Sequence, residues 1–114
     1  MELADIVILL DIYGELLAKS QRDALDMKYN DDLSLAEIAG EMGGISRQSV
    51  LYSIRKGEQK LSELEEKLGF AKRLRELSGE IGQARQLVED MKKDSSDPRL
   101  DKLGGLLAEI RGGI

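Results

Sequence analysis

The chain has 114 residues, of which 41% are hydrophobic, 34% are charged and only 4% are aromatic, with a single proline. This composition predicts one compact all-α domain with an appended helix, because a many-stranded sheet uses more aromatic and β-branched residues. The sequence contains neither Cys nor His. Disulfides and thiolate metal sites are therefore excluded, and the commonest general base is missing. We expect no enzyme, no metal site and no cofactor.

The charge is unevenly distributed along the chain. The net charge of −5 argues against general coating of nucleic acid, whose non-specific affinity comes from neutralised phosphates. Residues 1–45 carry ten acids and three bases, whereas residues 46–60 carry four bases and the single acid Glu58. Such a basic segment is the electrostatic footprint expected of a nucleic-acid contact. No apolar run is long enough to span a bilayer and no basic leader opens the chain, so we expect a cytoplasmic protein.

Two helices are predicted before residue 33. Apolar residues alternate at steps of three and four in the first, and its wide apolar stripe predicts burial on more than one side. Its face consists of Leu3, Ile6, Leu10, Tyr13 and Leu17, widened by Ile8, Leu9 and Ile12. Ser20 is the expected N-cap of the second helix, which ends at residues 30–32, Asn-Asp-Asp.

Residues 34–56 have the layout of a helix-turn-helix. Ser34 and Glu37 form a predicted capping box, Gly43 and Gly44 end the short first helix, and Ser46 caps the second. Small Ala39 allows a close crossing of the two helices. The second helix is expected to be fixed by Ile45, Val50 and Ile54 on its buried side.

The helix that starts at Ser46 is predicted to continue to Leu68, with weak points at Gly57 and Gly69 and a bend before Leu74. The next apolar stripe has coiled-coil-like spacing, so it is either a homodimer seam, which we favour, or a face folded back onto the first helix. This stripe comprises Leu74, Leu77, Ile81, Ala84, Val88 and Met91. We expect a helix-turn-helix bundle over residues 1–70, a long dimerising helix over 71–93, and a linker with a short amphipathic or disordered tail over 94–114.

Several segments together resemble the YlxM family of small bacterial DNA-binding proteins over roughly residues 1–90. They are residues 11–17 (DIYGELL), 20–22 (SQR), 29–39 (YNDDLSLAEIA), 45–50 (ISRQSV) and 56–58 (KGE). The resemblance implies an all-α helix-turn-helix, winged-helix-like or similar to region 4 of sigma factors. It also implies, by gene neighbourhood, a link to the signal recognition particle. The Gly43-Gly44 turn is one residue longer than the family pattern.

Two functions follow as hypotheses. The first is a regulatory DNA-binding protein whose second motif helix enters the major groove. Its expected nucleic-acid-binding residues are Ser46, Arg47, Gln48, Leu51, Tyr52, Arg55 and Lys56. The second is an interaction module that docks on a signal recognition particle component or a ribosome-associated partner without binding DNA. Leu51 and Tyr52 favour neither, since both suit a protein surface as well as a groove.

Overall fold

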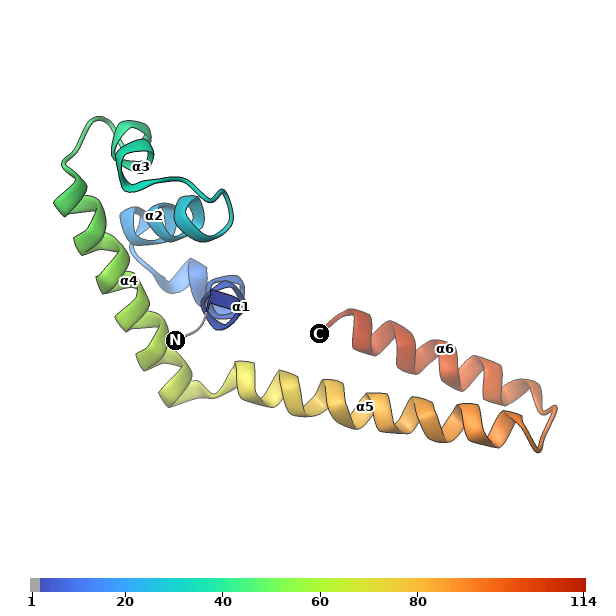
Figure 1. The fold of residues 1–114 in the computed structure, drawn as a ribbon. Helices are drawn as coiled ribbons and strands as arrows, with labels where there is room; N and C mark the ends of the chain where they lie inside the picture. Colours follow the sequence, from blue (N-terminus) through green and yellow to red (C-terminus); the bar gives the residue numbers. More distant parts are fainter. Residues whose placement is uncertain (1–2) are drawn as a thin grey trace. The chain divides into compact units, whose positions relative to one another are not determined.

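The computed structural model describes residues 3–114, which contain helices and no strand (Figure 1). The predicted all-α fold is confirmed. Residues 3–114 contain no strand and therefore no wing, so any likeness to a winged-helix protein concerns the helices alone. The elements are α1 (Leu3–Tyr13), the short 3-10 helix η1 (Gly14–Leu16), α2 (Lys19–Tyr29), α3 (Leu35–Glu41), α4 (Arg47–Leu68), α5 (Phe70–Lys92) and α6 (Pro98–Gly112). The chain divides into two compact units, one ending at Ala71 and one spanning Lys72–Ile114.

The first unit has a core in which α4 packs against α1, α2 and α3 (Figure 1). Its most deeply buried large side chains are Tyr13, Leu25, Ile38, Val50, Ile54 and Leu61. In α1 the predicted face is buried at Ile6 and Leu10 and exposed at Leu3, and on the widened stripe Leu9 is buried whereas Ile8 is exposed. The first helix is therefore buried less widely than its sequence predicted.

The start of α2 differs from the prediction. Ser20 is not the N-cap, because the helix already begins at Lys19 and Ala18 occupies the cap position. Leu17, which follows η1 in extended conformation, is buried. The chain therefore enters α2 from a buried position, and no side chain caps the helix start. Lys19 then pairs with Asp23 across one turn at 2.7 Å.

Helices α2 and α4 approach each other closely at Gly57, which is buried. A Cβ added at this position would lie 2.6 Å from Cδ1 of Leu25 and 3.3 Å from its Cγ. Leu25 is itself completely buried, so its side chain has no free space to move into. Gly57, predicted as a weak point of the helix, is instead the residue that lets the two helices meet.

This contact predicts opposite effects for two similar substitutions. Gly57→Ala should lower the free energy of unfolding by about 1–2 kcal/mol, because overpacking a full core outweighs the gain in helix propensity. Gly79→Ala in α5 is the matched control, since a Cβ there meets nothing within 4 Å. It should raise stability by roughly 0.5–1 kcal/mol. Urea unfolding of both variants measures the difference, and equal stabilisation by both would contradict the role of Gly57.

The capping box of α3 is confirmed. The Ser34 side chain accepts a hydrogen bond from the Glu37 amide at 3.1 Å, and the Glu37 carboxylate accepts one from the Ser34 amide at 3.1 Å. These bonds satisfy N–H groups that have no partner within the helix. The cap matters because α3 has only seven residues and cannot be stable by itself.

Ser34→Ala should therefore destabilise the protein by about 1 kcal/mol, since it removes the acceptor for the Glu37 amide. The loss should appear as a lower unfolding midpoint without any ligand. Ser34→Asp, which retains a capping oxygen, is the control and should keep most of the stability. A melting temperature unchanged by the alanine would show that the box contributes nothing.

The predicted bend after Leu68 is a complete break. Helix α4 ends at Gly69, which adopts the left-handed conformation with φ +64°, and α5 starts at the next residue. The Tyr13 hydroxyl donates to Oε1 of Glu65 at 2.7 Å and accepts from the Phe70 amide at 3.1 Å. The same Glu65 oxygen accepts from the Ala71 amide at 3.0 Å. The first turn of α5 is thus capped by side chains from α1 and α4.

The second unit consists of most of α5 and the antiparallel helix α6. Residues 98–112, expected as a short amphipathic helix or a disordered tail, form a helix that begins at Pro98 with Asp97 as its N-cap. Asp97 accepts from the Arg99 amide at 2.9 Å. Proline suits the first helical position, where an amide hydrogen would lack a partner.

Candidate nucleic-acid interface

The turn between α3 and α4 depends on two consecutive glycines. Gly43 and Gly44 have φ angles of +90° and +81°, which residues with a Cβ rarely adopt. The Gly44 amide donates to the carbonyl of Ala39 at 2.9 Å and so closes the end of α3. Ile45, predicted to be buried, is exposed. The glycine turn leaves it outside the core, and Val50 and Ile54 hold α4 without it.

The start of α4 is fixed by Ser46, whose hydroxyl accepts from the Ser49 amide at 3.0 Å. Val50 and Ile54 then face the core, as predicted. Of the predicted contact residues, Leu51 is half-buried and the other six are exposed: Ser46, Arg47, Gln48, Tyr52, Arg55 and Lys56. The structure therefore brings these six to the accessible surface at one end of the long helix.

The outward face of α4 extends further than the sequence analysis proposed. Gln48, Tyr52 and Arg55 recur at helical spacing, and Gln59 continues the same face one turn later. Beside it lies a shallow hollow lined by Leu16, Ala18, Gln21, Lys56, Gln59, Lys60 and Glu63. Gln59 and Lys60 were missed because they lie beyond the helix-turn-helix segment, although their spacing from Arg55 and Lys56 is visible in the sequence.

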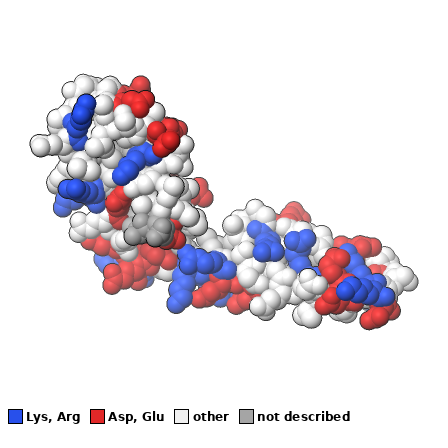
Figure 2. Space-filling view, viewed as in Figure 1, with Lys and Arg blue, Asp and Glu red and all other residues white. Residues whose placement is uncertain are grey.

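The one acid of the basic segment is turned toward α2. Glu58 accepts a short hydrogen bond from the hydroxyl of Tyr29, a residue of α2. The outward face over residues 47–56 thus carries Arg47, Arg55 and Lys56, with Lys56 Nζ lying 5.7 Å from the ring centre of Tyr52. Basic and acidic side chains both appear on the surface seen in Figure 2. The excess of positive charge is consequently a local feature of the outward face over residues 47–56 and does not extend over the whole surface.

Burial, together with the hydrogen bond to Glu58, raises the pKa of Tyr29 from 10.0 to about 12. The folded state therefore keeps this proton more tightly than the unfolded chain does. The resulting stabilisation is fully present below pH 10 and is lost as the pH rises from 10 towards 12.

We predict that unfolding in urea becomes markedly easier between pH 9 and pH 11.5, and that Tyr29→Phe reduces this change. Burial also raises the pKa of Tyr13, so a part of the change should persist in the variant. Tyr52→Phe, which removes an exposed hydroxyl and leaves the bond between Tyr29 and Glu58 intact, serves as the matched control. An identical pH dependence in wild type and Tyr29→Phe would contradict the assignment.

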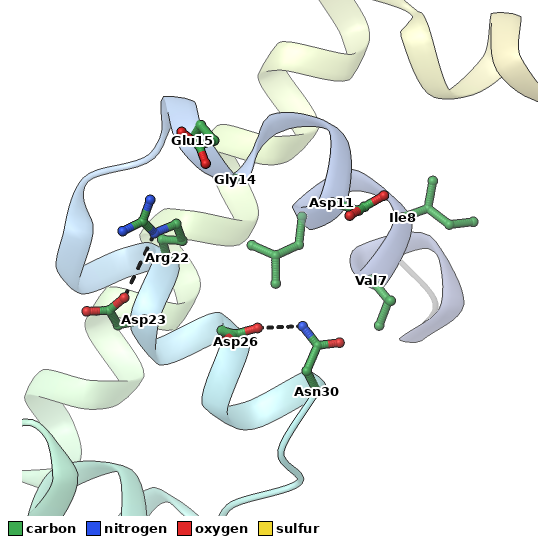
Figure 3. A pocket seen from close by; sticks show the side chains of 10 residues that line it. Val7, Ile8, Asp11, Gly14, Glu15, Arg22, Asp23, Asp26 and Asn30 are labelled. Atoms are coloured by element: carbon green, nitrogen blue, oxygen red, sulfur yellow. Dashed lines mark hydrogen bonds and ion pairs between the residues drawn. The ribbon is translucent and has the colours of Figure 1, made fainter. Parts of the chain in front are cut away.

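A second depression lies between α1 and α2, outside the α3–α4 motif (Figure 3). Its apolar wall includes Val7, Ile8 and Leu10, and its polar lining consists of Asp11, Glu15, Arg22, Asp23, Asp26 and Asn30. Arg22 lies 3.9 Å from Asp23, and Asn30 donates to Asp26 at 2.6 Å. Two of the lining acids, Asp23 and Asp26, thus have partners within the chain. Over residues 3–114, no three His, Cys, Asp or Glu side chains are placed to hold a metal ion.

A short capped helix, a glycine turn and a second capped helix with an exposed polar face define a helix-turn-helix protein. Comparison with known proteins agrees. The chain belongs to the UPF0122 family, because residues 2–102 match the family described as "Putative helix-turn-helix protein, YlxM / p13 like". The resemblance seen in the sequence is thereby confirmed.

Individual relatives cover most of the chain. It is 36% identical over 98 residues to a UPF0122 protein of Thermoanaerobacter sp., covering 86% of this chain and 83% of that protein. Identity to a UPF0122 protein of Desulforamulus reducens is 33% over 109 residues, covering 96% and 92%. A UPF0122 protein of Clostridium kluyveri is 40% identical over 96 residues, covering 84% and 86%. None of the helices within residues 3–114 is long and apolar enough to cross a membrane.

Proposed function

We propose that this protein binds double-stranded DNA through the outward face of α4 and acts as a regulator of transcription, without a catalytic step. The observation that carries the proposal is the exposed basic face at the start of α4, from which Glu58 is withdrawn by Tyr29. A helix of about 10–12 Å diameter fits the major groove, which is about 12 Å wide. The capped helix α3 and the glycine turn support the N-terminal end of α4, which would enter the major groove.

The exposed arginine, glutamine and lysine side chains each have a matching partner on DNA. Arg47 and Arg55 can donate two hydrogen bonds to guanine, and Gln48 can bond adenine in the same groove. Lys56 and Lys60 suit backbone phosphates, which position a protein without reading sequence. Because the whole chain has a net charge of −5, long-range attraction to DNA is weak, and affinity depends on these local contacts.

A second candidate function is docking on a protein, and the side chain of Tyr52 favours it. Tyr52 is 64% exposed at the centre of the outward face, next to half-buried Leu51. Exposed aromatic rings are common anchors in protein interfaces. The family's gene neighbourhood suggests a signal recognition particle component or a ribosome-associated protein as the partner. In this case the basic residues form the rim of a protein interface.

Binding to fluorescently labelled genomic DNA fragments, titrated against salt, separates the two functions. For a DNA reader, the logarithm of affinity should fall steeply and linearly with the logarithm of salt concentration. Lys56→Ala should reduce that slope by about one, whereas Arg47→Ala or Gln48→Ala should cost about 1–3 kcal/mol on the preferred fragment. Melting temperatures should stay unchanged, since all three side chains are exposed.

Lys67→Ala provides the matched control, because Lys67 is also an exposed base of α4 but lies in its last turn. It should bind like wild type. If no fragment binds even at low salt, DNA binding is excluded and the protein-docking candidate stands. Loss of partner capture in Tyr52→Ala, with capture retained in Lys67→Ala, would then support that candidate.

A further inference from the structure

The second unit has almost no core of its own. Helices α5 and α6 are joined near their turn by an ion pair of 3.1 Å between Lys92 and Asp101, and at the far end Arg111 donates to Ser78 at 3.4 Å. Within this unit only Val88 and Leu100 are buried among the described hydrophobic residues. Two helices with so small a core are not expected to hold together in water without further burial.

Five large apolar side chains of this unit remain between 44% and 64% exposed: Leu87 and Met91 on α5, and Leu103, Leu106 and Ile110 on α6. The contact between the helices includes Val88 on α5 and Gly104 on α6, where a Cβ would lie 3.6 Å from Cγ1 of Val88. At about 100° per residue, the exposed residues are displaced from this contact by about 60–100° on α5 and about 100–160° on α6, in the same rotational sense.

In an antiparallel pair, displacement in the same sense brings both sets of side chains to one side. The five residues therefore form a single surface, here called the hairpin face. The 15 residues of α6 and two helix diameters give it a length of about 22 Å and a width of about 20 Å. An exposed apolar patch of this size is typical of an interaction site, and the polar rim around it would supply the rest of the roughly 800 Å² of accessible area that a stable interface needs from each partner.

The charges of the second unit favour a second copy of this chain as the occupant. Residues 72–114 carry nine bases and eight acids, whereas residues 1–71 carry eight bases and fourteen acids. A nearly neutral unit with both signs on its surface does not repel its own copy. It also offers no attraction to a strongly charged partner. Exposed Glu80 on α5 and Lys102 on α6 provide opposite charges in the same unit.

We propose that the hairpin face packs against the same face of a second copy, so that two α5–α6 hairpins form a four-helix bundle. Such a contact between identical surfaces is the usual arrangement of a two-fold homodimer. The stripe predicted from the sequence contributes only part of it. Its residues Leu74, Leu77, Ile81 and Ala84 are half-buried and Val88 is buried within one chain, whereas Met91 is exposed on the hairpin face. Helix α6 supplies the larger share.

Sedimentation equilibrium of the full chain between about 1 and 100 µM tests the proposal. The wild type should sediment as a dimer at the upper concentrations. Leu87→Glu and Leu106→Glu should each weaken dimerisation about a hundredfold or more, because each would bury an unpaired charge between the hairpins. Gln86→Glu, which places the same charge at an exposed position of α5 away from the hairpin face, should dimerise like wild type.

Circular dichroism at low concentration should show the same helicity in all three variants as in the wild type at that concentration, since the replaced side chains are exposed in the single chain. A wild type that is monomeric at 100 µM would overturn the proposal and indicate that the hairpin face is covered within its own chain or by another protein. Dimers that persist in both leucine variants would overturn it as well. The result is independent of DNA binding, because no nucleic acid is present in the measurement.

Discussion

The close approach of α2 and α4 at Gly57 is the constraint on which the first unit depends. Helices α2 and α4 each pack against the other three helices of the set α1–α4, and their separation is set at Gly57, where a side chain would collide with Leu25. One side of α4 is thereby committed to the core over Val50, Ile54 and Leu61. The opposite side is left free, and it is this side that carries the polar and basic residues.

The local signals of the helix-turn-helix could be predicted from the sequence because they act over three or four residues. Ser34 and Glu37, the glycine pair and Ser46 specify their own hydrogen bonds whatever the rest of the chain does. The periodicity of Val50 and Ile54 likewise identifies the buried side of α4. The exposure of the six candidate contact residues follows from that assignment.

Other features depend on contacts between distant parts of the chain, and the sequence does not reveal these. Gly57 has a low helix propensity, and only the packing of Leu25 from α2 shows why it is required. The chain enters α2 from the buried Leu17, and the capping tendency of Ser20 is not used. The withdrawal of Glu58 depends on Tyr29, a residue 29 positions earlier. In each case a tertiary contact outweighs a local preference.

The hydrogen bonds of Tyr13 have a consequence for the order of folding. They join residues separated by 52 positions (Glu65) and 57 positions (Phe70), whereas the caps of α3 and α4 span three. Closing such a long loop costs more chain entropy than forming a capped turn. The capped helices should therefore form early, and the connection of α1 to the start of α5 should form late. Interactions that form late chiefly slow unfolding. The hydrogen bonds of Tyr13 should therefore affect the unfolding rate, and with it the lifetime of the native state, more than the folding rate.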